Sequence, residues 1–178
     1  MIDYNFKDRP DKERIEATAA EYYDIDPKMV VNFIDFQWTY RNMQKQYDEL
    51  LDRFGLSESR YIILMFLRRA DSKMLLPSDI AVKLGARRPT VSKLLKGMEQ
   101  AGHVVKIVSD LDKRSVYFQI TGSGEQILQK FIPESFLAVK NLFNYFEESD
   151  FDQLAVLLDK VKRGTTTMIK DDLENEQK

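Results

Sequence analysis

Basic side chains gather in one stretch of this 178-residue sequence, between Lys83 and Arg114. The stretch holds eight Lys or Arg residues against three Asp or Glu residues, a net charge of +5, whereas 19 basic and 26 acidic residues leave −7 elsewhere. A basic block inside an acidic chain is typical of a surface that binds a polyanion such as nucleic acid. A solvated charged face gives the same pattern. The secondary structure that carries the basic block therefore has to distinguish the two alternatives.

Residues 77–95 have the spacing of a helix–turn–helix. Ala81 is small where the second helix would cross the first, and Gly85 stands where the turn favours a left-handed backbone. We therefore expect helices over 77–85 and 88–101, of which the second presents hydroxyl and cationic side chains outward. The alternative is an ordinary helical hairpin in which Gly85 is only a cap. The positions expected to pack the two helices together are Ile80, Leu84, Val91 and Leu94.

The two segments that follow, 103–108 (HVVKIV) and 115–120 (SVYFQI), are rich in β-branched and aromatic residues and predict a two-stranded hairpin. A hairpin directly after a helix–turn–helix makes a winged helix. In that arrangement the second helix enters the major groove of DNA, and an arginine at the tip of the wing reaches the minor groove. The predicted tip carries Lys113 and Arg114, and Asp112 is placed to orient the Arg114 guanidinium.

A long helix is predicted before this core, from near Pro27 to Gly55. Its apolar side chains recur at steps of three and four, and so long a stripe at the edge of a small protein needs a partner. A helix over 58–69, capped by Ser57, and a short apolar link over 74–76 lead into the helix–turn–helix. The stripe consists of Val30, Phe33, Phe36, Tyr40, Met43, Tyr47, Leu50 and Phe54.

After the hairpin, a helix is expected from about residue 124 to 147, capped by Thr121 or Ser123 and kinked at Pro133. A last helix is expected to start at Ser149 or Asp150 and to run to about residue 169. The fold class is therefore mainly α with a small β-wing, a winged helix–turn–helix domain joined to a helical region.

Composition removes several classes of function. The absence of Cys excludes disulfides, thiolate metal sites and a thiol nucleophile, and a single His leaves little for a metal site or a His-based triad. Asp110 and Asp112 lack a third metal ligand nearby, and no carboxylates cluster in an apolar context for acid–base catalysis. The longest apolar run, 61–67, is far short of the roughly 18 residues of a spanning helix, and the N-terminus has no apolar signal segment. We therefore expect a soluble, cytoplasmic protein that has no cofactor and is not an enzyme.

The sequence resembles the multiple antibiotic resistance regulator (MarR) family over about residues 28–170. The resemblance implies a homodimeric winged helix that binds pseudo-palindromic operator DNA, usually as a repressor. It divides the chain into an N-terminal arm (1–27), a helical dimerisation region (28–55 and 122–172), a winged helix–turn–helix (56–121) and a frayed tail (173–178). The matching segments are 56–64 (LSESRYIIL), Ile80-Ala81, Leu84-Gly85, 90–94 (TVSKL), 98–102 (MEQAG), 112–115 (DKRS) and Ile120-Thr121 with Gly124.

The resemblance also implies which side chains face DNA. Lys106 stands where the family usually has Arg before the wing, and Asp112 matches the residue that orients the wing arginine. The family often opens its recognition helix with a Ser or Thr cap, which Pro89 and its two preceding arginines replace here. Gly97 inside the helix costs about 1 kcal/mol relative to Ala, and relieves crowding against either DNA or the hairpin. The expected DNA-binding residues are Arg87, Arg88, Thr90, Ser92, Lys93, Lys96, Lys106, Lys113 and Arg114.

Three other features of the sequence allow more than one interpretation. Gly122-Ser123-Gly124 resembles a phosphate cradle but lacks a third glycine, so a helix start is favoured. Trp38 and the aromatic residues of the first long helix form either the dimer core or the wall of a crevice for a small aromatic effector. A sensor based on thiol oxidation is excluded because there is no Cys. The alternative function is a winged-helix protein–protein module without DNA binding, against which the basic surface of the second helix argues.

Overall fold

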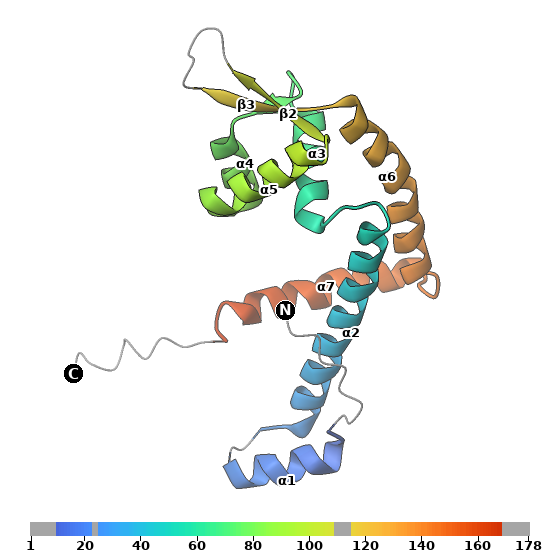
Figure 1. Cartoon of the computed structure of the whole chain (residues 1–178). Helices are drawn as coiled ribbons and strands as arrows, with labels where there is room; N and C mark the ends of the chain where they lie inside the picture. The colour runs from blue at the N-terminus through green and yellow to red at the C-terminus, as the bar shows by residue number, and fades with distance from the viewer. Residues whose placement is uncertain (1–9, 23–24, 109–114, 169–178) are drawn as a thin grey trace, which may run out of the picture. The chain divides into compact units, whose positions relative to one another are not determined.

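The computed structural model describes residues 10–22, 25–108 and 115–168 and is mostly helical, with one small antiparallel sheet (Figure 1). This confirms the predicted fold class. The chain divides into two compact units, with the boundary inside a helix between Ile132 and Pro133. The elements are α1 (Lys12–Tyr22), α2 (Pro27–Asp52), α3 (Glu58–Arg69), β1 (Met74–Leu75), α4 (Pro77–Leu84), α5 (Arg88–Gln100), β2 (Val104–Val108), β3 (Val116–Ile120), α6 (Gly122–Leu142) and α7 (Glu148–Thr165).

The first unit begins with a pair of helices, α1 packed on α2. Ile15 is the buried residue of α1. The start of α2 is set by Asp26, whose side chain accepts a hydrogen bond from the N–H of Lys28 (2.9 Å), and by Pro27 in the first turn. The chain leaves α2 through Gly55 in the left-handed region (φ +66°). The helix predicted from Pro27 to Gly55 is therefore confirmed.

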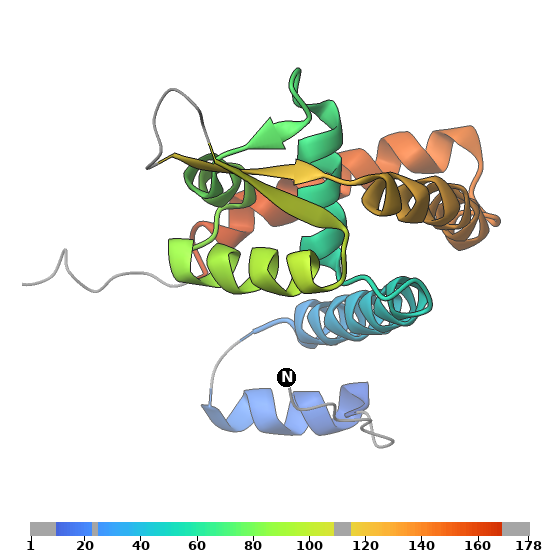
Figure 2. The ribbon, with the colours of Figure 1, turned by 45° about the horizontal axis from the view of Figure 1, so that its top comes forward.

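The sheet has one strand more than the sequence predicted. The segment predicted as a link contains β1, whose Met74 and Leu75 pair antiparallel with Gln119 and Phe118 of β3, giving the order β1-β3-β2. Two residues are too few to show the alternation that identifies a strand, so only the pairing reveals it. Together α3, α4 and α5 pack against this sheet (Figure 2).

The core of the first unit joins these helices and the sheet to the start of α6. Phe131 of α6 is fully buried and makes edge-to-face contacts with Tyr61 (4.8 Å between ring centroids), Phe54 (5.5 Å) and Tyr47 (6.2 Å). Burial raises the pKa of the Tyr61 hydroxyl; the neighbouring Tyr47 raises it further and Arg69 opposes the shift. The other buried apolar side chains include Ile63, Leu64, Leu67, Ile80, Val91, Leu95, Met98, Val104, Phe118, Ile120 and Leu128.

The boundaries of α6 and α7 correct the predictions. Thr121, not Ser123, caps α6, because its Oγ1 accepts a hydrogen bond from the N–H of Gly124 (3.1 Å). The helix runs through Pro133 but ends at Leu142, five residues before the predicted end. Beyond it, the rings of Phe143 and Phe146 in the turn pack with that of Phe151 in α7. The start of α7 is set by the Asp150 carboxylate, which accepts from the N–H of Glu147 (2.8 Å) at the N-cap position. Among the described residues, no helix is both long and apolar enough to cross a membrane.

Candidate nucleic-acid interface

The turn between α4 and α5 has the geometry of a helix–turn–helix. Gly85 adopts a left-handed backbone (φ +65°) at the end of α4, as its position predicted. The N–H of Ala86 donates to the carbonyl of Ala81 (3.0 Å), and Ala81 is buried between the helices. Ile80 and Val91 are buried at the contact, but Leu95 is the buried leucine of α5, whereas Leu94 is only partly buried. Leu84 and Leu94 both pack against the core, as predicted, and Leu95 is a buried position of α5 that the prediction did not include.

The recognition helix α5 has one buried face and one cationic face. Val91, Leu95 and Met98 are buried, Leu94 and Gly97 between them are partly buried, and Ser92, Lys93 and Lys96 are exposed. None of the exposed cations on α5 or at its N-cap has an ion-pair partner within the described part of the chain. The exposed residues are Arg87, Arg88, Thr90, Ser92, Lys93 and Lys96, which are six of the predicted DNA-binding residues.

The N-terminus of α5 is strongly electropositive. Arg87 is its N-cap and makes no side-chain capping bond, while its carbonyl accepts from the N–H groups of Thr90 (3.0 Å) and Val91 (3.2 Å). The first turn of α5, all of which the structure describes, has no acidic residue. Two guanidinium groups therefore add to the positive end of the helix dipole, an arrangement that attracts phosphate.

The wing hairpin is present as predicted, with each strand starting one residue later. β2 and β3 pair over five positions, from Val104 opposite Ile120 to Val108 opposite Val116. The predicted tip residues Asp110, Asp112, Lys113 and Arg114 lie outside the described residues, so their roles stay predictions.

Lys106 of β2 differs from the other predicted DNA-binding cations that the structure describes, because it has a partner within the chain. Its Nζ lies 3.0 Å from Oε2 of Glu99, at the end of α5, and 5.8 Å from the ring centroid of Phe118. The pair lies in an open groove between α5 and the strands, about 440 Å³ in volume. The groove is lined by Pro77, Ser92, Leu95, Lys96, Glu99, Gln100, Lys106 and Phe118.

Two glycines of the motif serve packing. A Cβ on Gly97 would lie 3.2 Å from a guanidinium nitrogen of Arg60, so its close neighbour is α3 and not the hairpin. A Cβ on Gly124 would overlap the carbonyl oxygen of His103 and lie 2.9 Å from Cγ1 of Ile120. The close approach of α6 to the hairpin thus accounts for Gly124, as expected for a helix start.

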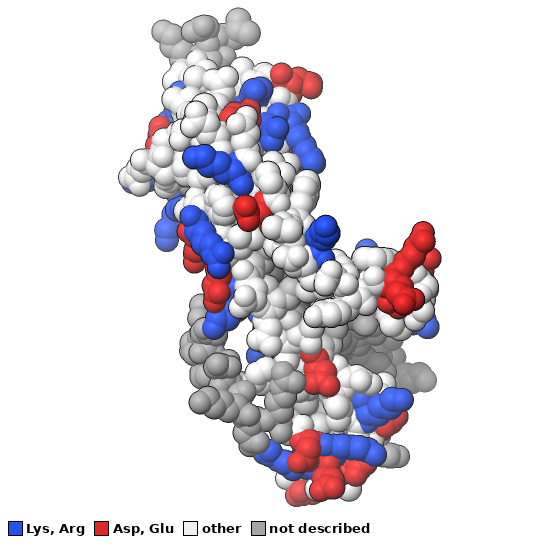
Figure 3. Space-filling model, turned by 90° about the vertical axis from the view of Figure 1, so that its right-hand side faces the viewer, with Lys and Arg blue, Asp and Glu red and all other residues white. Residues whose placement is uncertain are grey.

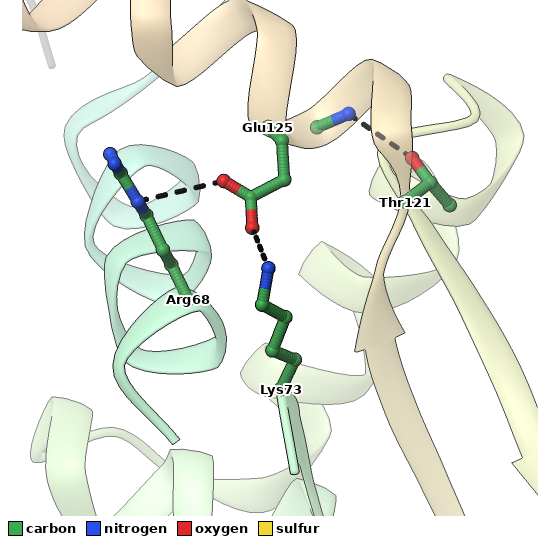
Figure 4. Close-up of polar contacts among 5 residues, drawn as sticks. Arg68, Lys73, Thr121 and Glu125 are labelled. Carbon is green, nitrogen blue, oxygen red and sulfur yellow. Dashed lines mark hydrogen bonds and ion pairs between the residues drawn. The ribbon is translucent and has the colours of Figure 1, made fainter. Parts of the chain in front are cut away.

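A polar clamp holds the first turn of α6 on the winged helix (Figure 4). Glu125 binds Lys73 with one oxygen (2.9 Å, Nζ to Oε1) and Arg68 with the other (3.5 Å, Nε to Oε2). The Thr121 hydroxyl, besides capping α6, donates to the carbonyl of Gly102 (2.7 Å) at the end of α5. Of this clamp only the Thr121 cap was predicted, because the partners of Glu125 are more than fifty residues away in sequence.

The only histidine, His103, directly precedes β2, and its carbonyl accepts a hydrogen bond from the N–H of Thr121 (3.1 Å). Its Nδ1 is buried and has no hydrogen-bond partner among the described residues. Burial lowers the pKa of His103, and the nearby positive charge of Arg60 lowers it further. The described residues hold no group of three or more His, Asp or Glu side chains that could bind a metal ion.

Charge is distributed differently elsewhere on the surface. On the face shown in Figure 3, Lys and Arg side chains are interspersed with Asp and Glu side chains. The outward face of α5, in contrast, exposes cations and hydroxyls at successive positions.

A three-helix core containing a helix–turn–helix, followed by an antiparallel hairpin, defines a winged-helix protein. Known proteins agree with this class: the model of the MarR family matches residues 54–115. The chain is 25% identical to the HTH-type transcriptional repressor YetL of Bacillus subtilis over 152 residues, 85% of this chain and 91% of YetL. It is 23% identical to the transcriptional repressor MprA of Escherichia coli over 124 residues, 70% of each chain.

Solved structures show the same fold. AbsC, a MarR family transcriptional regulator of Streptomyces coelicolor, superimposes with a TM-score of 0.67 at 20% identity, over 81% of this chain and 98% of AbsC. Sco3205, a MarR family transcriptional regulator from the same organism, was solved in complex with DNA. It superimposes with a TM-score of 0.67 at 19% identity, over 79% of this chain and 89% of Sco3205. The family-model match to the winged helix, the curated relatives and the solved structures together support a MarR family winged-helix regulator.

Proposed function

We propose that this chain is a transcriptional regulator that binds operator DNA through α5 and the wing, as a cytoplasmic homodimer and without catalysis. The observation that carries the proposal is the exposed face of α5. Its cations have no partner within the described residues and begin at an uncapped helix N-terminus. The relatives named as repressors, and the related regulator solved with DNA, support the same function.

In the proposed complex, α5 lies in the major groove. Arg87 and Arg88 lie at the start of α5 and Lys93 and Lys96 on its exposed face, so the four cations meet phosphates on either side of the groove. Thr90 and Ser92 add hydroxyls that bond to phosphates or base edges. Arg114, oriented by Asp112, enters the neighbouring minor groove, which is narrowest and most negative in A·T-rich sequence.

We propose that a second copy of the chain covers the apolar faces outside the winged helix. On α2, Phe33, Phe36, Tyr40 and Met43 are each 40–53% exposed at steps of three and four residues. The second unit also exposes apolar side chains, among them Leu157, Leu158 and Val161 of α7. Contiguous apolar patches of this kind mark association surfaces in soluble proteins. The dimerisation region of 28–55 and 122–172 would then set two recognition helices about 34–36 Å apart on one face of DNA.

A small aromatic effector that weakens DNA binding is a further part of the proposal. The exposed rings of α2 and the half-buried Trp38 supply aromatic surface on which such a molecule could stack. Because Trp38 is the only tryptophan, its fluorescence reports binding directly. Quenching by a phenolic compound together with weaker DNA binding would support the effector, and unchanged fluorescence across a phenol series would contradict it.

A salt titration of DNA binding tests the proposed function. Each phosphate contact contributes about −0.9 to the slope of log K against log salt, so Lys93→Gln should make the slope of a dimer shallower by about 1.8. Lys130→Gln, at an exposed lysine of α6, is the matched control and should keep the wild-type slope. Equal slopes for wild type, Lys93→Gln and Lys130→Gln would contradict DNA binding through α5. A winged helix that binds only proteins would show no DNA affinity at all.

A further inference from the structure

We propose that Glu99 is an internal counter-ion for Lys106, which keeps that lysine away from DNA phosphate and so lowers the affinity of the recognition surface for DNA. The inference rests on the proposed function. It assigns Glu99 as a residue that sets affinity, and it removes Lys106 from the set of phosphate contacts that the sequence predicted.

The two residues are held opposite each other by fixed elements. Glu99 lies in the last turn of α5 and Lys106 in the middle of β2, and these elements join through a tight turn. In that turn the N–H of His103 donates to the carbonyl of Met98 (2.9 Å), next to the buried Val104. The backbones are therefore fixed, and only the two side chains must be ordered to form the 3.0 Å ion pair.

Phe118 directs the lysine toward Glu99. Lys106 and Phe118 are directly opposed in the β2–β3 ladder, and the ammonium lies 5.8 Å from the centroid of the Phe118 ring. Contact with the ring face favours this position of the cation, in the groove that Ser92 and Lys96 also line. Lys106 is thus at the edge of the proposed DNA surface but is paired within the chain.

The pairing is selective. The four cations at the start and along the exposed face of α5 have no ion-pair partner among the described residues, whereas Lys106 has one. Its side chain remains 51% exposed and that of Glu99 32%, so the pair is accessible to solvent and contributes little to folding. Because phosphate contacts carry no sequence information, Glu99 should lower affinity for operator and unrelated DNA alike.

Salt titrations of four proteins test the inference: wild type, Glu99→Gln, Lys106→Gln and the double variant. Fluorescence anisotropy is recorded on a duplex recovered by selection from a random pool and on a duplex of unrelated sequence, over roughly 50–200 mM salt. Glu99→Gln should bind both duplexes more tightly and steepen the slope by about 1.8 for the dimer, one released lysine per protomer. Lys106→Gln should keep the wild-type slope, and the double variant should behave like Lys106→Gln.

A shallower slope for Lys106→Gln alone would overturn the inference, because Lys106 would then contact phosphate in the native protein. An effect of Glu99→Gln that persists without Lys106 would also overturn it, since removing any nearby negative charge would suffice. Asp79→Asn, at an exposed acid of α4, controls for that general effect and should keep the wild-type slope. If the wild type binds neither duplex, the proposed function itself fails and the inference with it. If the wild type binds but the slopes do not separate, only the inference fails.

Discussion

Replacing Gly124 with alanine should destabilise the protein, although alanine is the better helix former. A Cβ at this position would overlap the carbonyl oxygen of His103 and lie 2.9 Å from the Ile120 side chain and 3.3 Å from the His103 carbonyl carbon. Two of these three atoms belong to the backbone of the hairpin, which can move only if β2 or the clamp at Thr121 also moves. The strain therefore has no flexible side chain to absorb it.

The expected loss of stability in Gly124→Ala can be estimated from comparable substitutions in packed interiors. Forcing one extra carbon into a well-packed site costs about 1–3 kcal/mol. Against this, a Gly-to-Ala change gains about 0.4–1 kcal/mol by restricting the unfolded chain. Gly122→Ala is the matched control, because no atom lies within 4 Å of its Cβ position at the start of the same helix. The control should be neutral or slightly stabilised, so the difference between the two variants isolates the contact with His103.

Urea unfolding at one fixed protein concentration measures both variants, since the stability of a dimer depends on concentration. Gly124→Ala should lower the midpoint with an unchanged m value. In thermal unfolding each kcal/mol corresponds to about 2–4 °C for a chain of this length. A Gly124→Ala protein as stable as Gly122→Ala would refute the close approach of α6 to the hairpin.

Three further predictions concern the clamp, the histidine and the apolar face of α2. Glu125→Gln removes two partly exposed ion pairs and should lower the free energy of unfolding by about 0.5–1.5 kcal/mol. This loss should be smaller in a Lys73→Gln background, and an equal loss in that background would contradict the clamp. Because the pKa of His103 is lower in the folded state than in the unfolded chain, the unfolded chain binds more protons, and the free energy of unfolding should fall as pH drops below about 6.5. His103→Asn should flatten the pH profile of stability in this range. A profile as steep as that of the wild type would exclude His103 as the cause. Phe36→Glu places a charge in the apolar face of α2 and should shift sedimentation toward the monomer, whereas an intact dimer would exclude this face from the interface.

Local signals were enough to predict the helix–turn–helix. Gly85 at the end of α4 and Pro77 at its start act within one turn of the chain, so the sequence alone identified this helix. The long helix from Pro27 and the hairpin followed equally well from periodicity and β-branched content. The exposed face of α5 was predictable because its buried positions recur with the helical period.

Contacts between distant residues were not predictable in the same way. β1 is defined only by pairing with a strand more than forty residues later, and two residues leave no pattern of their own. The partners of Glu125 depend on how α3 and α6 meet, and the Glu99–Lys106 pair depends on the path of the turn after α5. The start of α7 was misplaced because Asp150 acts from within the first turn rather than at the cap.

Selection of bound sequences from a random duplex pool tests the central proposal most directly. The purified full chain is incubated with the pool at moderate salt, and the bound DNA is amplified and sequenced. We expect an inverted repeat whose half-sites lie about 10 base pairs apart, as two recognition helices on one face of DNA require. The Lys93→Gln protein, which loses only a phosphate contact, should recover the same repeat at lower affinity, and Lys130→Gln should recover it at wild-type affinity. A pool that shows no enrichment with the wild-type protein would contradict sequence-specific DNA binding by this chain.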